Sequence, residues 1–330
     1  MRRFVPIVGC LLLCLSSCHN NDKDNNIVSE RYTHKYGYAV SKDEFEKRKY
    51  PGQVVTVLKS GVTVTATYED GLLHGPSTHT HPHSTNVESY YLYNQGNLVK
   101  QIFYDIQGMP TREELQLSPT RFAATKWYTD GTPMSTEEFA GAELVEGQYF
   151  TRQNDVESRV EKGRGLKIIR DLQGTLQAKE DIDQGFVVKR DTFYASGAPE
   201  SSVSFIRGIL HGEKRSFAEN GEPIAVKEYV NGKLHGRTTF YKNGAKAVEV
   251  HYLDGLRNGL EIHYVDGEIV SQEILWENDR RHGPSKYYVD GIAQVEYFYD
   301  GDKVSEHKWN ELSQLDQMIG QIDAPSSWRR

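Results

Sequence analysis

The chain is dominated by a short motif that returns at an almost constant interval. An aromatic residue stands two positions before a turn dipeptide such as Asn-Gly or Asp-Gly, and the corresponding aromatics lie 24, 23, 24 and 22 residues apart: Phe205, Tyr229, Tyr252, Trp276 and Phe298. A period of this length is the signature of a repeat architecture, in which each unit packs on its neighbours. The motif therefore restricts the chain to a stacked array of small units.

Each unit has the composition of two short strands joined by tight turns. Asn-Gly and Asp-Gly favour the positive φ angles of type I′ turns, and alternating residues flank them, as expected for β-hairpins. The turn pairs are Asn220-Gly221, Asn231-Gly232, Asn243-Gly244, Asp254-Gly255, Asp266-Gly267, Asp290-Gly291 and Asp300-Gly301. We predict an all-β fold: an elongated, single-layer array of antiparallel β-hairpin repeats over residues 51–305.

The same pattern also occurs well before the C-terminal third. The segment Tyr68-Glu-Asp-Gly-Leu-Leu-His-Gly75 matches Tyr229-Val-Asn-Gly-Lys-Leu-His-Gly236 almost residue for residue, and eroded copies lie between them. Residues 155–190 are the least repeat-like, so a break or bend is expected there.

These residues carry a family resemblance. Tyr-x-Asn/Asp-Gly-x-Leu-His-Gly followed by Phe/Tyr-Tyr-x-x-Gly resembles the MORN-repeat variant of bacterial proteins, often described as YwqK-like antitoxins, over roughly residues 58–305. The resemblance implies a twisted sheet of consecutive hairpins that serves as a scaffold or binding surface. The chain departs from the pattern at Asn258, which replaces the histidine, and at Asn278-Asp279, which replaces one Asn-Gly turn.

The N-terminus has the form of an export signal. Arg2 and Arg3 precede an apolar run from Phe4 to Leu15, which is too short to cross a bilayer as a helix. The following Leu15-Ser-Ser-Cys18 resembles the lipobox of bacterial lipoproteins, which implies that residues 1–17 are removed and that Cys18 carries the acyl chains. An ordinary signal peptide that happens to contain cysteines is the alternative.

Cysteine usage agrees with lipidation. Cys10 and Cys14 lie in the segment expected to be removed, so Cys18 is the only thiol left and no disulfide can form within the mature chain. Residues 18–50 are predicted to be the lipidated cysteine and a polar tether. Because His19 rather than Asp follows the cysteine, resemblance to the sorting rule of lipoproteins favours the outer membrane over the inner one.

The C-terminal residues 306–330 have a helical pattern. Apolar residues recur there every three or four positions, which predicts an amphipathic helix of about three to four turns: Trp309, Leu312, Leu315, Met318, Ile319 and Ile322. An open array needs covered ends, so this helix is expected to cap the last hairpin; a helix that docks a partner is the alternative.

One histidine cluster is the only group with metal-binding potential that we identify. His79, His81 and His83 alternate, so His79 and His81 could present two imidazoles to a Zn²⁺ ion on one strand face. Pro82 interrupts the strand, and no carboxylate or cysteine nearby completes a ligand set, so a solvated polar loop is the competing interpretation. A separate set at one repeat position is expected to form structural packing or turn hydrogen bonds: His74, His211, His235 and His282.

Composition and motifs exclude several classes of function. Removal of Arg2 and Arg3 takes the formal charge from −7 to −9, and basic residues form no long run, which argues against a nucleic-acid partner. The sequence contains no catalytic signature for a hydrolase, metalloprotease, redox protein or phosphate-binding loop, so we predict neither an enzyme nor a cofactor.

These observations predict a non-enzymatic lipoprotein anchored in the bilayer through Cys18, whose repeats bind an unidentified protein at the bacterial envelope or surface. The first alternative is a lipoprotein that binds a metal or small ligand through His79, His81 and His83. The second is an antitoxin-like neutralising protein, as implied by the family resemblance. An enzyme whose residues are scattered over the array is a further alternative.

Overall fold

The computed structural model describes residues 26–322, which contain twenty-six β-strands and two α-helices. Every strand pairing in this part of the chain is antiparallel and the sheet is not closed, which confirms the predicted all-β hairpin array. The chain divides into two compact units, within which the described residues are 26–109 and 110–322. Each unit is described separately.

The first unit is a seven-stranded sheet with one short helix. Its elements are β1 (Ile27–His34), β2 (Ala39–Val40), α1 (Lys42–Arg48), β3 (Gly52–Leu58), β4 (Thr63–Glu69), β5 (Leu72–Thr80), β6 (Val87–Asn94) and β7 (Asn97–Tyr104). β1 lies between β2 and β3, and the strands from β3 to β7 then follow in chain order.

The first strand and helix correct one sequence-based prediction. We assigned residues 18–50 to a polar tether, but the described part of that range is folded. α1 begins after Ser41, whose hydroxyl accepts a hydrogen bond from the amide of Glu44, a standard N-cap. Its Phe45 is buried against Tyr32 of β1 and Val54 of β3, so the helix covers the first hairpins.

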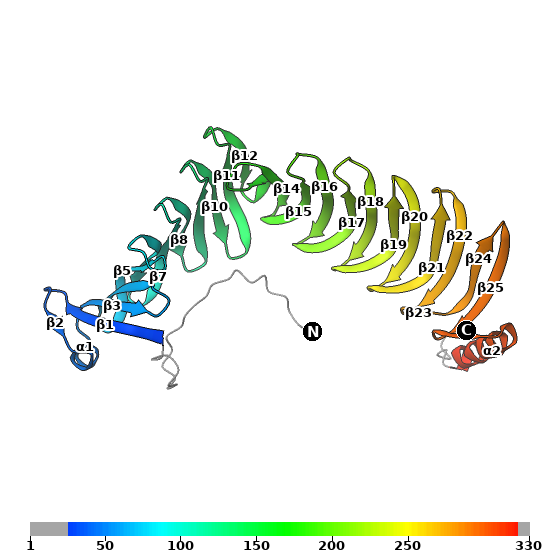
Figure 1. The fold of residues 1–330 in the computed structure, drawn as a ribbon, viewed down its shortest axis with the longest axis horizontal. Helices are drawn as coiled ribbons and strands as arrows, with labels where there is room; N and C mark the ends of the chain where they lie inside the picture. The colour runs from blue at the N-terminus through cyan, green and yellow to red at the C-terminus, as the bar shows by residue number, and fades with distance from the viewer. Residues whose placement is uncertain (1–25, 323–330) are drawn as a thin grey trace, which may run out of the picture. The chain divides into compact units, whose positions relative to one another are not determined.

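The second unit continues the hairpin succession to the C-terminal helix. Its elements are β8 (Pro110–Ser118), β9 (Arg121–Trp127), β10 (Pro133–Ala140), β11 (Glu143–Phe150), β12 (Val156–Glu161), β13 (Arg164–Arg170), β14 (Leu176–Asp183), β15 (Phe186–Phe193), β16 (Pro199–Ile206), β17 (Ile209–Phe217), β18 (Pro223–Val230), β19 (Lys233–Lys242), β20 (Ala245–Leu253), β21 (Leu256–Val265), β22 (Ile269–Glu277), β23 (Arg280–Arg281), β24 (Gly283–Val289), β25 (Ile292–Tyr299), β26 (Asp302–Val304) and α2 (Glu306–Ile322). Figure 1 shows β14 to β25 following one another in chain order.

Turns at one edge of this sheet, which we call the stacked edge, are bonded to each other. The amide of a turn residue donates to a carbonyl in the unit before it: Gly232 to Leu210, Gly255 to Leu234, Asp279 to Arg257 and Gly301 to Arg281, all at 2.8–2.9 Å. These bonds satisfy amides that the hairpins themselves leave free, and they fix the spacing between neighbouring units.

The opposite edge, which we call the open edge, carries two kinds of turn. At 128–132, 151–155, 171–175, 194–198 and 218–222, the first residue donates its amide to the carbonyl of the fifth. Asn220-Gly221 therefore belongs to a longer turn than the predicted type I′ turn, and only its glycine has positive φ. Farther along, Asn243-Gly244 and Asp290-Gly291 have the positive φ at both positions that the sequence predicted.

The repeat motif places an aromatic side chain opposite a glycine. Tyr229 pairs with Gly212, Tyr252 with Gly236, Trp276 with Gly259 and Phe298 with Gly283. Each glycine has φ between +87° and +105°, a conformation that a side chain would strain. An added Cβ at Gly236 or Gly283 would also come within 2.7 Å of Glu228 or Leu275 in a preceding strand. Positive φ and this close approach explain why glycine recurs at the position.

The best-buried core of the second unit includes the stretch that looked least repeat-like. Leu144, Tyr149, Val160, Ile168 and Ile182 form one buried cluster on β11 to β14. Within this stretch β12 pairs with β13 only at Val160 and Glu161.

The C-terminal helix forms where the sequence predicted it, and α2 contacts β25. The Tyr297 hydroxyl donates to Glu306 at 2.9 Å, and the rings of Tyr297 and Trp309 lie 5.6 Å apart. Leu315 and Met318, by contrast, are exposed, so only the first half of the apolar stripe is covered. Neither helix within residues 26–322 is long and apolar enough to cross a bilayer.

Candidate functional site

The three histidines of the predicted cluster lie at the end of one strand and in the loop that follows it. His79 lies in β5 with its ring 5.2 Å from that of Tyr91. His81 and His83 lie in the loop after β5, as Pro82 indicated. The His81 backbone amide donates to the carbonyl of Asn86, and the buried Nε2 of the His81 ring has no hydrogen-bond partner among the described residues.

His83 and His79 contact neighbouring protein groups. The His83 amide donates to the Gly61 carbonyl, and its ring lies against Gly61, where an added Cβ would come within 2.5 Å. Burial lowers the pKa of His79, which keeps its imidazole neutral. Among residues 26–322, no three His, Cys, Asp or Glu side chains are placed to hold one ion.

Two histidines of the repeat position, His74 and His282, make the predicted turn hydrogen bonds, whereas the buried Nδ1 of His235 has no hydrogen-bond partner in the described part of the chain and lies 3.6 Å from Asp254. His74 Nδ1 accepts the amide of Gln95 at 3.2 Å, and its Nε2 lies 3.3 Å from Glu69. His282 Nδ1 accepts the amide of Asp300 at 3.4 Å in the same way. These imidazoles join one hairpin to the turn of the next and have a structural role.

A buried ion pair and a tyrosine hydroxyl join β10, β11 and β13. Glu137 is buried, accepts the Tyr149 hydroxyl at 2.8 Å, and pairs with Lys167 Nζ at 2.7 Å. Burial, together with the nearby charge of Glu137, raises the pKa of Tyr149 far above its ordinary value, so the phenol stays protonated and donates. The carboxylate is matched by one cation and one hydroxyl, an arrangement that stabilises the fold.

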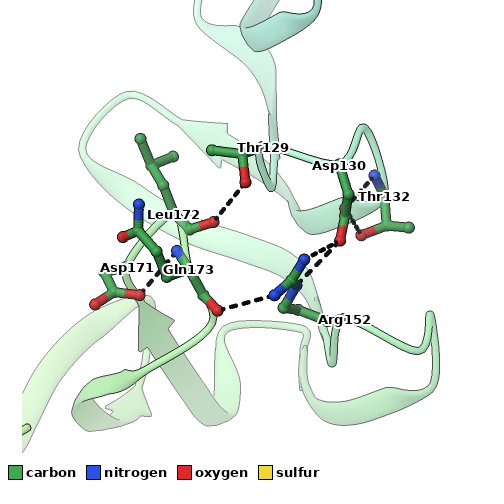
Figure 2. Close-up of polar contacts among 7 residues, drawn as sticks. All are labelled: Thr129, Asp130, Thr132, Arg152, Asp171, Leu172 and Gln173. Atoms are coloured by element: carbon green, nitrogen blue, oxygen red, sulfur yellow. Dashed lines mark hydrogen bonds and ion pairs between the residues drawn. The ribbon is translucent and has the colours of Figure 1, made fainter.

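A second polar group joins three successive turns of the open edge (Figure 2). Arg152 donates from Nε and Nη2 to one oxygen of Asp130, at 3.0 and 2.6 Å, and from Nη1 to the carbonyl of Gln173 at 3.4 Å. The Thr129 hydroxyl donates to the carbonyl of Leu172 at 3.4 Å. The guanidinium therefore spans turns 128–132, 151–155 and 171–175.

Asp130 is committed to this turn network. Its other carboxylate oxygen accepts the hydroxyl and the amide of Thr132, at 2.6 and 3.0 Å. These bonds, with those from Arg152, lower the pKa of Asp130 to about 2. Sequence reasoning missed this group because its members lie about twenty residues apart and meet only through the stacking of turns.

Concave regions along the second unit are broad depressions open to solvent. One of about 420 Å³ is lined by Ala124, Glu137, Gly147 and Arg159, and another of about 820 Å³ lies between α2 and the stacked edge near Tyr299. Catalysis and tight capture of small molecules favour enclosed, largely apolar cavities. In the first depression the Glu137 carboxylate pairs with Lys167 and accepts the Tyr149 hydroxyl, and in the second the Asp316 carboxylate accepts the Tyr299 hydroxyl.

Exposed aliphatic side chains gather at the last two hairpins of the open edge. Val265 and Ile269 flank one turn and are 48% and 66% exposed, while Val289 and Ile292 flank the next and are 53% and 70% exposed. Because β22 pairs with β24, the two turns follow one another at the same edge of the sheet. We call these four residues the aliphatic tip. Exposed apolar groups that gather in this way mark interaction surfaces.

Cys18, the predicted lipidation site, lies outside the described residues.

Comparison with known proteins identifies no family. No protein-family profile matches the chain, and no curated protein matches it. Similarity to solved structures is weak. A Photorhabdus luminescens Tc holotoxin pore is 12% identical with a TM-score of 0.20, and the match covers 78% of this chain and 16% of that one. A TcdB2–TccC3–Cdc42 complex is 11% identical with a TM-score of 0.19, and the match covers 74% of this chain and 19% of that one.

A porin-like protein from Bacteroides uniformis is 9% identical, with a TM-score of 0.15, over 81% of this chain and 92% of that one. The present chain spans less than a fifth of the two toxin chains. Likenesses this weak carry no argument about fold or function.

Proposed function

We propose that the chain is a non-enzymatic lipoprotein that is held in the bacterial envelope through Cys18 and binds another protein through its hairpin array. The observation that carries the proposal is the aliphatic tip. Four exposed aliphatic side chains on adjacent hairpins expose apolar area to water, and covering them with a partner is favourable.

The rest of the array supports a scaffold. Its turns are joined by backbone bonds and by Arg152, its buried charges are paired, and its depressions are open. A surface fixed in this way loses little conformational freedom on binding, which favours association with a protein over a broad face. The resemblance to MORN-variant repeats points in the same direction.

Membrane attachment rests on the sequence. The basic residues, the short apolar run and Cys18 fit a lipoprotein signal, and several acyl chains hold a protein stably where one does not. The outer membrane is the proposed location.

The experiment compares two doubly substituted full-length chains as bait for envelope proteins, with quantitative mass spectrometry as the readout. Ile269→Ser with Val289→Ser removes half of the aliphatic tip. Leu253→Ser with Leu256→Ser is the matched control, because these side chains are 46% and 43% exposed at a turn of the opposite edge.

We expect one reproducible partner with the unchanged chain and the control, and a loss of roughly tenfold or more with the tip variant, as for interface residues worth more than 1 kcal/mol each. Equal recovery with both variants would reject the aliphatic tip as the binding surface. Stoichiometric zinc uptake without a protein partner would favour the histidine loop instead.

A further inference from the structure

The C-terminal edge of the sheet in the second unit is only half covered. β25 pairs with β24 along its length from Ile292 to Phe298, but its other side pairs with β26 only from Tyr297 to Tyr299. After Val304 the chain leaves the edge and enters α2. Within residues 26–322, the outer side of 292–296 therefore faces no strand.

The turn geometry shows which backbone groups face outward. A two-residue turn joins Val289 to Ile292, and another joins Tyr299 to Asp302. The two residues that flank such a turn form a hydrogen-bonded pair. Backbone polar groups alternate sides along an antiparallel strand. Ile292 therefore bonds toward β24 and Tyr299 toward β26, so the N–H and C=O groups of Ala293 and Val295 point to the uncovered side.

This edge lacks the features that usually prevent strand addition. Natural edges carry lysine, proline, bulges or inward charges. Residues 292–296 read Ile-Ala-Gln-Val-Glu, with one charge, and the Glu296 carboxylate is already paired with Lys303 at 2.6 Å. The free side of β1 in the first unit, residues 27–31, instead carries Glu30 and Arg31.

We propose that this edge is a self-association site, at which β25 of one copy pairs with β25 of a second copy in an antiparallel, two-fold symmetric arrangement. A two-fold contact uses the same patch on both partners, so the strand must be complementary to itself. The proposal does not depend on the lipid anchor, and the edge shares only Ile292 with the aliphatic tip.

The outward groups select one register. If Ala293 of one copy lies opposite Val295 of the other, all four outward residues of the two strands form hydrogen-bonded pairs within the uncovered stretch. A register centred on Ala293 would place Val295 opposite the turn residue Gly291, and one centred on Val295 would place Ala293 opposite Tyr297, which β26 already occupies. The selected register is therefore centred on Gln294.

The side chains are compatible with this register. Ala293 and Val295 share one face of the sheet, so Ala293 of each copy lies opposite Val295 of the other. On the other face Glu296 lies opposite Ile292, which keeps the two glutamates apart. Gln294 faces its own copy as a non-hydrogen-bonded pair, with Cα atoms about 4.5 Å apart.

The test uses cysteine cross-linking in the full chain, with Cys10, Cys14 and Cys18 replaced by serine and the protein held in detergent. Gln294→Cys then supplies the single thiol. A Cα separation of about 4.5 Å suits a disulfide, so mild oxidation at a few tens of micromolar is expected to give a covalent dimer on non-reducing gels.

Ile292→Cys is the matched control on the same edge. In the proposed register the two copies of residue 292 lie four positions apart along the strand, about 14 Å, which is beyond disulfide reach. We expect Gln294→Cys to yield roughly tenfold more dimer than Ile292→Cys. Adding Val295→Lys, which places a charge on the interface without removing a bond to β24, is expected to abolish that dimer.

Equal cross-linking of Gln294→Cys and Ile292→Cys would show random collision and overturn the proposal. The absence of a Gln294→Cys dimer would overturn it as well. Circular dichroism confirms that each variant keeps its β-sheet content, and light scattering of the unoxidised chain is expected to show a dimer that Val295→Lys converts to monomer.

Discussion

Removing the Tyr149 hydroxyl from the core of the second unit is expected to lower the free energy of unfolding more than removing the hydroxyl of another buried tyrosine. Tyr149 is 2% exposed, and its hydroxyl donates to Glu137, which is 7% exposed. The change Tyr149→Phe preserves the ring packing on Leu144 and Val160 and removes only the donor. Glu137 then keeps Lys167 as its remaining partner among these contacts.

The expected cost follows from the nature of the acceptor. A hydrogen bond to a charged group is worth about 1.5–3 kcal/mol, whereas a neutral one contributes about 0.5–1.5 kcal/mol. Tyr128→Phe is the matched control, because Tyr128 is 1% exposed and donates to the Phe150 carbonyl at 2.7 Å. Tyr149→Phe should therefore lower the free energy of unfolding by about twice as much as Tyr128→Phe.

Urea unfolding followed by circular dichroism measures both changes. Comparable m-values would show that the same cooperative transition is compared in each chain. A double-mutant cycle with Glu137→Gln isolates the contact, since residues that share a buried network couple by about 0.5–3 kcal/mol.

The reasoning would be refuted if Tyr149→Phe cost no more than Tyr128→Phe. It would also be refuted if the two substitutions at Tyr149 and Glu137 were additive, because the hydroxyl would then contribute nothing through the carboxylate.

Three further results are expected. Thr132→Val should raise the pKa of Asp130 from about 2 toward its ordinary value, because the hydrogen bond from the Thr132 hydroxyl is the largest cause of the lowering. The depressed pKa stabilises the fold at pH values above the unfolded-state pKa of about 3.9, and this contribution is lost as the pH falls toward 2. An unchanged Asp130 titration in the variant, followed by NMR, would refute this prediction. Gly165→Ala should disrupt the pairing of β12 with β13, since φ is +144° and a Cβ would lie 2.2 Å from a backbone oxygen. Gly208→Ala has open space around it and should lower the stability measured by thermal unfolding by only about 1–2 kcal/mol, the strain of the turn. A similar loss of stability in both variants would contradict this prediction. Cys18→Ala should move the chain from the membrane pellet to the soluble fraction, and retention in the pellet would rule out the lipid anchor.

Local patterns made most of the fold predictable. Asn231-Gly232 and Asp254-Gly255 identify hairpins because few other residues adopt positive φ cheaply, and the spacing from Tyr229 to Tyr252 gives the unit length. The pairing of these aromatics with glycine could not be read from the period, because it depends on the register between strands.

The boundary of the array and its polar contacts were less accessible from sequence. Residues 27–50 look polar enough for a tether, yet Tyr32 and Phe45 meet across α1 and β1 and bury each other. The Arg152–Asp130 contact joins turns 22 residues apart, so its partners are identifiable only once the turns are stacked. The alternation of His79 and His81 indicated a shared strand face, but the strand ends at Thr80, so His81 lies in the following loop.

The central claim is that the aliphatic tip binds a protein at the envelope, and site-specific photo-crosslinking in intact cells tests it most directly. A photoreactive residue is placed at Ile269 of the tip and, as control, at Leu256 of the stacked edge. The account predicts one discrete adduct with another protein at Ile269 and none at Leu256. Adducts of the same pattern at both positions, or none at either, would contradict it.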